Sequence, residues 1–161
     1  MTGAPLPDAA LRVQRALEQH GVTTIIRELP VSTRTAQEAA AAIDCSVSQI
    51  VKSLVFRTAS GNPVLVLASG SNRVDEATVS AVVGESIAKA DADFVRDRTG
   101  FAIGGVPPLG HRIALPTLID EDLLQYEEVW AAAGTPHVVF PVAPAQLATS
   151  TGGRVTRVTK A

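Results

Sequence analysis

Residues 50–57 of this 161-residue chain read Ile-Val-Lys-Ser-Leu-Val-Phe-Arg, and residues 63–68 read Pro-Val-Leu-Val-Leu-Ala. Both runs are rich in β-branched and aliphatic side chains, and Ser60-Gly61-Asn62 between them suits a tight turn. They predict a β-hairpin. Its first strand carries apolar side chains on both faces, which is typical of a strand in the middle of a sheet.

Lys52 interrupts this apolar run, and it is one of only three lysines among 14 basic residues. Side chains alternate along a strand, so Lys52 shares a face with Leu54 and Phe56. Burying an unpaired ammonium costs roughly several kcal/mol. Such a lysine therefore either reaches solvent at the end of its strand or lines a cavity that holds an anionic or polar ligand.

Helices and strands surround the hairpin without a regular β-α-β order. Thr35-Ala36-Gln37-Glu38 is a capping-box pattern, which predicts a helix that begins after Thr35. We therefore expect an α+β fold, a mixed, barrel-like β-sheet surrounded by helices, in a single domain over residues 1–161. The expected helices and helical turns are 8–20, 35–43, 46–49, 75–83, 91–98, 120–124 and 144–148; the further strands are 22–29, 87–90, 101–103, 113–115, 129–131, 137–142 and 155–158.

The segment Gly104–Gly110 is a second candidate for chemistry. Two adjacent glycines allow backbone conformations that other residues avoid, and they leave main-chain amides uncovered. Two prolines, Pro107 and Pro108, then stiffen the exit of the loop. Successive amides in such a loop can bind an oxyanion or phosphate, but a rigid turn between two strands explains the same composition.

Composition excludes several classes of protein. A formal net charge of −2 argues against broad coating of nucleic acid. A single cysteine, Cys45, excludes an internal disulfide, and the spacing of the three histidines does not suggest a metal site, so we expect no metal and no cofactor. We see no signal peptide and no apolar run of about 18 residues, so we expect a cytoplasmic protein without a membrane span.

Two stretches together resemble a known family. Residues 50–55 (IVKSLV) followed by residues 99–110 (TGFAIGGVPPLG) look like the YbaK/ProX family, freestanding relatives of the editing domain inserted in bacterial prolyl-tRNA synthetases. The resemblance implies the mixed, barrel-like fold. It also implies an aminoacyl-tRNA deacylase, a trans-editing hydrolase of translation fidelity that releases a wrong amino acid from the 3′ end of a tRNA, usually a proline tRNA.

The resemblance also assigns residues to the site. Lys52 matches the lysine that holds the tRNA 3′ end, and Gly104 to Pro108 match the Gly-x-x-x-Pro loop that approaches the ester. Catalytic roles are thus expected for Lys52, Gly104, Gly105 and Pro108, and substrate-binding roles for Ser53, Ile26, Thr35, Val106, Pro107, Gly134 and His137.

The expected mechanism uses water as the nucleophile, because no activated Ser or Cys is visible. A small residue such as alanine, serine or cysteine is the natural amino acid to remove, because the pocket must exclude the larger cognate one. The expected partners are the acceptor end of an aminoacyl-tRNA and prolyl-tRNA synthetase, with no DNA and no membrane, for a monomer or weak dimer.

Two other readings stay open: a non-catalytic module that binds a small metabolite or nucleotide in the same pocket, and a different small hydrolase acting on a free ester or a nucleotide. For the tRNA reading we expect cations at the mouth of the Lys52 pocket. The candidates for this rim are Arg27, Arg34, Arg73 and Arg112.

Overall fold

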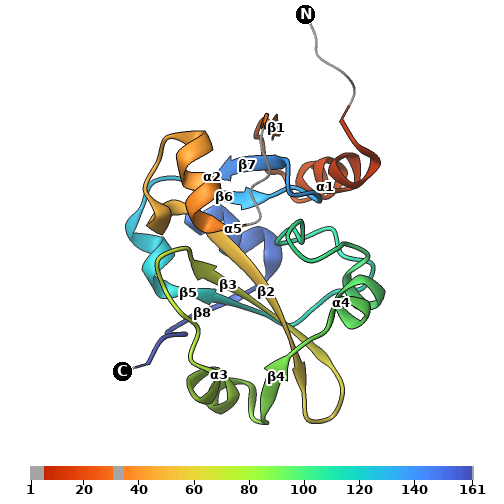
Figure 1. Ribbon diagram of the computed structural model, residues 1–161, viewed down its shortest axis with the longest axis vertical. Coiled ribbons are helices and arrows are strands. Elements are labelled where there is room, and N and C mark those ends of the chain that lie inside the picture. The colour runs from red at the N-terminus through yellow and green to blue at the C-terminus, as the bar shows by residue number, and fades with distance from the viewer. Residues whose placement is uncertain (1–5, 31–34, 161) are drawn as a thin grey trace, which may run out of the picture.

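The computed structural model describes residues 6–30 and 35–160 of the chain (Figure 1). Helices and strands alternate irregularly along it, so the predicted α+β class is confirmed. The helices are α1 (Asp8–Gln19), α2 (Ala36–Ile43), α3 (Glu76–Val83), α4 (Ala92–Thr99) and α5 (Pro144–Thr151), with short 3-10 helices at Val47–Gln49 and Glu121–Gln125. The strands are β1 (Arg27–Glu28), β2 (Val51–Thr58), β3 (Pro63–Ser69), β4 (Ile87–Lys89), β5 (Thr117–Asp120), β6 (Val129–Ala132), β7 (Val138–Val142) and β8 (Arg154–Thr156).

The predicted hairpin forms the middle of the larger sheet, whose strand order is β4-β2-β3-β5-β8. β2 and β3 pair antiparallel in a register that runs without interruption from Val51↔Ser69 to Arg57↔Pro63. β3 is buried along its whole length, and it pairs in parallel with β5 on its other side. The sheet is therefore mixed, as the sequence predicts.

A second sheet, with the order β1-β7-β6, packs beside the first. The two sheets meet at a single parallel bridge between Ile50 and Trp130. The strands of the described chain thus form two open sheets rather than one closed barrel. Apolar side chains fill both faces of the larger sheet: one cluster includes Leu65, Leu67 and Phe140, and the other includes Val66 and Val79 of α3.

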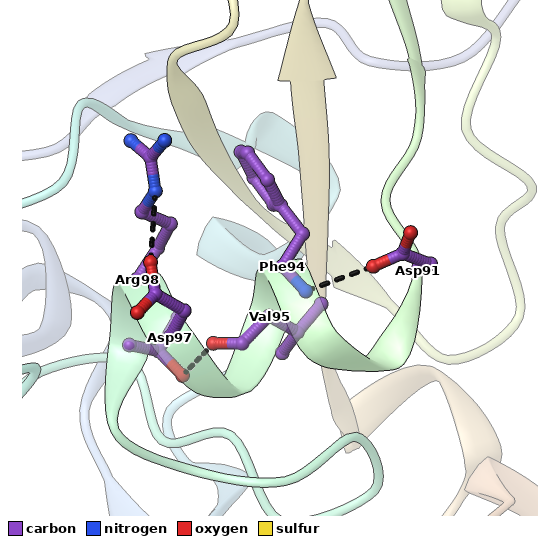
Figure 2. A network of polar contacts seen from close by, with 6 residues as sticks. Asp91, Phe94, Val95, Asp97 and Arg98 are labelled. Atoms are coloured by element: carbon purple, nitrogen blue, oxygen red, sulfur yellow. Dashed lines mark hydrogen bonds and ion pairs between the residues drawn. The ribbon is translucent and has the colours of Figure 1, made fainter.

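Side-chain caps begin α2 and α4, the helices next to the hairpin; the sequence predicts the cap at Thr35, whereas Asp91, expected inside the helix 91–98, precedes α4 as its cap. The Thr35 hydroxyl accepts a hydrogen bond from the Glu38 amide, and the Glu38 carboxylate accepts one from the Thr35 amide, so the capping box is confirmed. In α4 the Asp91 carboxylate accepts from the Phe94 amide at 2.8 Å (Figure 2). These caps fix where α2 and α4 begin, and both helices lie beside the candidate site.

Two predicted strands are wrong, and both belong to one long loop between α4 and β5. Residues 101–103 and 113–115 adopt turns and bends instead. The α4 helix ends at Gly100 with a φ of +82°, and the buried Thr99 hydroxyl then accepts from the Phe101 amide and so turns the chain at once. The predicted strand 22–29 is shorter than expected, because only Arg27–Glu28 pairs with β7. No helix in the described ranges is long and apolar enough to cross a bilayer.

Candidate functional site

Two cavities lie side by side along β2. The first has a volume of about 350 Å³, and its walls come from α2, β2, β6 and the Gly104 loop. The second has a volume of about 570 Å³ and is bounded by β2, β4 and the segment that leads into α3. Both cavities share a wall made by Lys52, Ser53, Leu54, Ile103 and Val106. The structure therefore brings the predicted lysine strand and the predicted loop together at one place.

Lys52 is half-buried at this shared wall. Its Nζ donates a hydrogen bond to the main-chain oxygen of Asn72, at 2.5 Å. Burial lowers the pKa of Lys52, and the carboxylate of Asp120 opposes that fall. The ammonium is thus held at a cavity wall rather than extended into solvent, which resolves the two alternatives that the sequence left open.

Asp120 organises the polar groups behind Lys52. It is 1% exposed, and one of its oxygens, Oδ2, accepts from the Ser69 amide at 3.0 Å and from Asn72 Nδ2 at 2.9 Å. The helical turn expected over residues 120–124 makes Asp120 its first residue, and the Oδ1 of Asp120 accepts from the Asp122 amide as a cap would. Its second contact, through Asn72 to Lys52, joins segments about 50 residues apart, so no local pattern could have shown it.

Ser53 contributes a hydroxyl that has no partner. Its Oγ is buried and makes no hydrogen bond within the described part of the chain. A buried polar atom without a partner costs about 1–3 kcal/mol. Because Ser53 lines both cavities, this hydroxyl is available to a ligand in either of them.

The loop 104–108 forms the wall opposite β2 through contacts that only glycine allows. Gly104 has a φ of +95° and lines the first cavity. A Cβ on Gly105 would lie 2.7 Å from the main-chain oxygen of Gly134, so the two backbones touch. His111 Nε2 lies 2.6 Å from the main-chain oxygen of Pro107, and burial lowers the pKa of this histidine. The loop is therefore fixed on both sides.

The other predicted residues lie at different distances from the two cavities. Thr35 and Val106 line the first cavity, and Val106 lines the second as well. Pro107 and Pro108 are buried within the loop, behind the cavity wall. His137 is exposed, and its main-chain oxygen accepts from the Leu29 amide. Ile26 lines a separate depression beside α1 instead of either Lys52 cavity.

The predicted cationic rim is only partly assembled. Arg73 lines the second cavity together with Lys89, but Asp75 and Glu76 line it too. The Arg27 guanidinium lies over the ring of Trp130, at 5.2 Å, and Trp130 lines the first cavity. The other two predicted rim residues are not placed at either cavity. Arg112 lies beside Gly100 and lines neither cavity, and Arg34 is outside the described residues.

No side chain in the described site is prepared for covalent or metal chemistry. Burial and the nearby Asp44 and Glu128 raise the pKa of Cys45, which disfavours its thiolate. Among residues 6–30 and 35–160, no group of three or more His, Cys, Asp or Glu side chains could hold a metal ion. What the site does offer is an ammonium, a free hydroxyl and main-chain groups.

Comparisons with known proteins agree with this geometry. Residues 31–149 match the family model of the aminoacyl-tRNA editing domain. A crystal structure described as a candidate trans-editing enzyme for prolyl-tRNA synthetase has 49% sequence identity and a TM-score of 0.92, and the alignment covers 98% of this chain and 100% of that one.

Two curated relatives are more distant. A candidate Cys-tRNA(Pro)/Cys-tRNA(Cys) deacylase, EbsC of Enterococcus faecalis, is 25% identical over 90% of both chains. An uncharacterized protein, YwhH of Bacillus subtilis, is 29% identical over 76% of this chain and 78% of its own. The family match spans most of the chain, including β2 and the 104–108 loop. The chain therefore belongs to the aminoacyl-tRNA editing domain family and is an aminoacyl-tRNA deacylase.

Proposed function

We propose that this deacylase acts in trans on proline tRNA that carries a small, non-cognate amino acid. One supporting likeness is the structure at 49% identity, which is described as a candidate trans-editing enzyme for prolyl-tRNA synthetase. The other is EbsC, whose name gives Cys-tRNA(Pro) as a substrate. In this proposal prolyl-tRNA synthetase supplies the mischarged tRNA, and the reaction takes place in the cytoplasm.

The observation that carries the proposal is that Lys52 and Gly104 line one cavity of about 350 Å³. An editing site must hold the phosphate or ribose of the acceptor end beside the ester it hydrolyses. An ammonium suits the first group, and the main chain of a glycine-rich loop suits the second. We assign Lys52 to the tRNA 3′ end and the Gly104–Pro108 loop to the ester, with Pro108 and Pro107 holding the loop in shape.

The two cavities differ in a way that assigns the two parts of the substrate. Most residues around the first cavity are small or apolar, including Ala36, Ala39 and Ala132, and Lys52 is its one charged lining residue among those described. This chamber suits a small amino-acid side chain and would exclude a larger one. The second cavity has three cations at its walls, Lys52, Arg73 and Lys89, against the two carboxylates of Asp75 and Glu76, and this excess of positive charge favours that direction for the acceptor end.

The proposed reaction is direct hydrolysis. A water oxygen attacks the ester carbonyl carbon, and the bond between that carbon and the ribose oxygen breaks. The leaving oxygen takes up the proton that the water loses, so the products are a free amino acid and a tRNA with its terminal hydroxyl. Main-chain N–H groups of the loop stabilise the negative charge on the carbonyl oxygen, and positioning supplies the rest of the acceleration.

A deacylation assay tests the proposal. The wild-type protein is assayed on alanyl-, seryl- and cysteinyl-tRNA(Pro), and so is Lys52→Ala, with Arg15→Ala as the control that removes a cation from an exposed position on α1. We expect Lys52→Ala to lower kcat/KM by about 100-fold or more, since it removes the charged contact at the substrate. The control should retain wild-type activity.

Three results would contradict the proposal or its assignment of Lys52. Binding of mischarged tRNA without release of the amino acid would favour a non-catalytic module. Equal rates on free aminoacyl esters and on aminoacyl-tRNA would favour a general ester hydrolase. An unchanged rate in Lys52→Ala would remove the lysine from the mechanism.

A further inference from the structure

β2 has two edges, and only one of them is fully paired. Along the first edge β3 pairs with every residue from Val51 to Arg57. Along the second edge the partners change: Trp130 of β6 bridges to Ile50 at the beginning, and β4 pairs with Phe56 to Thr58 at the end. Between these two partners, the described part of the chain places no strand against the second edge.

The direction of the main-chain groups follows from three hydrogen bonds at the two ends of β2. Ile50 accepts from the Gly70 amide at 2.7 Å, and Thr58 donates to Asn62 at 2.8 Å, so both face the β3 side. Ala59 donates to Ser86 at 2.9 Å, so it faces the β4 side. Main-chain groups alternate along a strand, and the register has no break. The N–H and C=O groups of Ser53 and the N–H group of Val55 therefore point to the open part of the second edge, between the Trp130 bridge and the first β4 pair.

This open edge lies where the two cavities meet. The first cavity reaches it from the β6 end, and the second from the β4 end; Ser53 and Leu54 belong to both. Ile103 and Val106 of the loop lie on the opposite side of the same space. The unpartnered Ser53 hydroxyl lies here as well. Main-chain donors and acceptors without a strand partner thus line the place where a substrate would bind.

We propose that the open edge of β2 binds the main chain of the substrate's amino acid. This inference rests on the proposed function. The α-ammonium donates to the C=O of Ser53, and the ester carbonyl oxygen accepts from the N–H of Val55, so that the amino acid lies opposite Leu54 as a residue of a parallel strand would. Trp130 already meets the same edge in the parallel sense, at Ile50.

This arrangement separates two tasks. Every α-aminoacyl ester has the same N–Cα–C=O unit, so the strand edge binds it without reading the side chain. Selection of the side chain falls to the small, apolar walls of the first cavity. The edge also holds the carbonyl oxygen at an N–H donor, where negative charge develops as water attacks.

Amide hydrogen exchange measured by NMR tests the site, with internal controls in the same strand. The probe is alanyl-adenosine in which an amide replaces the ester. In the free protein the amides of Ser53 and Val55 should exchange at least about tenfold faster than those of Leu54 and Phe56, which bond to β3. Binding of the probe should slow exchange at Val55 by at least about tenfold and leave Leu54 unchanged.

A pair of substrates of matched shape supplies the second arm. Propionyl-tRNA(Pro) lacks only the amino group of alanyl-tRNA(Pro), and each enzymatic rate is divided by the uncatalysed rate of the same ester. We expect the acceleration to fall by about tenfold or more without the ammonium, because a charge-assisted hydrogen bond is lost.

Two outcomes would overturn the strand-edge site in a protein that still hydrolyses alanyl-tRNA(Pro). One is equal acceleration of propionyl-tRNA(Pro) and alanyl-tRNA(Pro) hydrolysis, and the other is amide exchange at Val55 that does not slow when the probe binds. If the wild-type protein hydrolyses no mischarged tRNA(Pro), the proposed function fails, and this site fails with it.

Discussion

The two walls of the site are built in opposite ways. β2 is one strand of a continuous ladder, so many equivalent main-chain bonds hold Lys52 and Ser53 in place. The loop that faces it has no ladder. It is held by contacts that each occur once: the close approach of Gly105 to Gly134, the His111–Pro107 hydrogen bond and the hydrogen bond at the buried Thr99 hydroxyl. When one bond of a ladder is lost, the neighbouring bonds still hold the strand, whereas a contact that occurs once has no neighbour to replace it. Substitutions in the loop should therefore cost more than comparable ones behind the strand.

The largest effect is expected for Gly105→Ala. The new Cβ would lie 2.7 Å from Gly134 O and 2.7 Å from Thr135 Cα, both main-chain atoms that cannot rotate away. We expect a loss of about 2–4 kcal/mol in the free energy of unfolding and a fall of more than about 100-fold in deacylation. Urea unfolding and the tRNA assay measure the two quantities.

The control for this prediction is Gly84→Ala at the end of α3. Its φ of +93° also disfavours alanine, but nothing lies within 4 Å of the new Cβ. It should cost only about 1 kcal/mol and leave deacylation unchanged. Equal losses of stability in the two variants would show that the close approach of Gly105 to Gly134 does not hold the loop.

A smaller effect is expected behind the strand, for Asp120→Asn. Asp120 raises the pKa of Lys52 against the effect of burial, so removing its charge lowers that pKa further. If deacylation needs the ammonium, activity should then be lost at a lower pH on the alkaline side of the profile. We expect a fall of about tenfold near pH 9 and a smaller one at pH 7, measured as kcat/KM against pH.

Asp122→Asn is the matched control for Asp120→Asn. Its Oδ2 also accepts from Asn72 Nδ2, at 2.7 Å, but Asp122 is exposed. The alkaline limb should stay where it is in the wild type. The same shift in both variants would mean that a changed hydrogen bond from Asn72, rather than the lost charge of Asp120, moves the pH profile.

His111 makes the loop sensitive to acid. Burial holds its folded pKa below the ordinary value near 6.5, so the neutral ring is favoured by folding. Its contribution to stability is present above the unfolded pKa and is lost as the pH falls through the folded pKa. His111→Gln retains a donor for Pro107 and does not titrate. Between pH 7 and pH 5 its free energy of unfolding should fall less than that of the wild type, by about 1 kcal/mol, in urea titrations. Parallel pH dependences in the two proteins would exclude His111 as the titrating group.

The smallest effect is expected for Arg73→Ala at the wall of the second cavity. Arg73 is exposed, and loss of one phosphate contact should raise KM for aminoacyl-tRNA by about two- to fivefold at low salt. The difference should shrink as salt rises, and kcat should stay the same. A fall in kcat with an unchanged KM would place Arg73 at the ester instead of the acceptor end.

The same contrast decides what the sequence could predict. The hairpin, Lys52 and the cap at Thr35 depend on local alternation and on short spacings, which are visible in one dimension. Apolar residues at 101–103 and 113–115 predict two strands that the loop does not form. Its true path depends on the contact of Gly105 with Gly134 and on the Thr99 hydroxyl.

The sequence indicates only part of the role of Asp120, for a related reason. The amide that Asp120 caps, that of Asp122, is two residues away, but the hydrogen bond from Asn72 spans 48 positions. No single-sequence pattern reports a contact of that length. For Ser53 the sequence predicted a binding role, yet the open edge that its main chain faces appears only when the registers of β4 and β6 are known.

The single bridge between Ile50 and Trp130 has a consequence for how such a protein can diversify. It is the seam of two sheets, and α2 packs over it through Ala36, Ala39 and Ala40. Exchanging Ala36 or Ala39, which line the first cavity, for larger residues would make that cavity smaller, while the Lys52 strand and the 104–108 loop keep their own supports. In the proposed function, substitutions in α2 would therefore change which amino acid is accepted without altering the groups that carry out the hydrolysis.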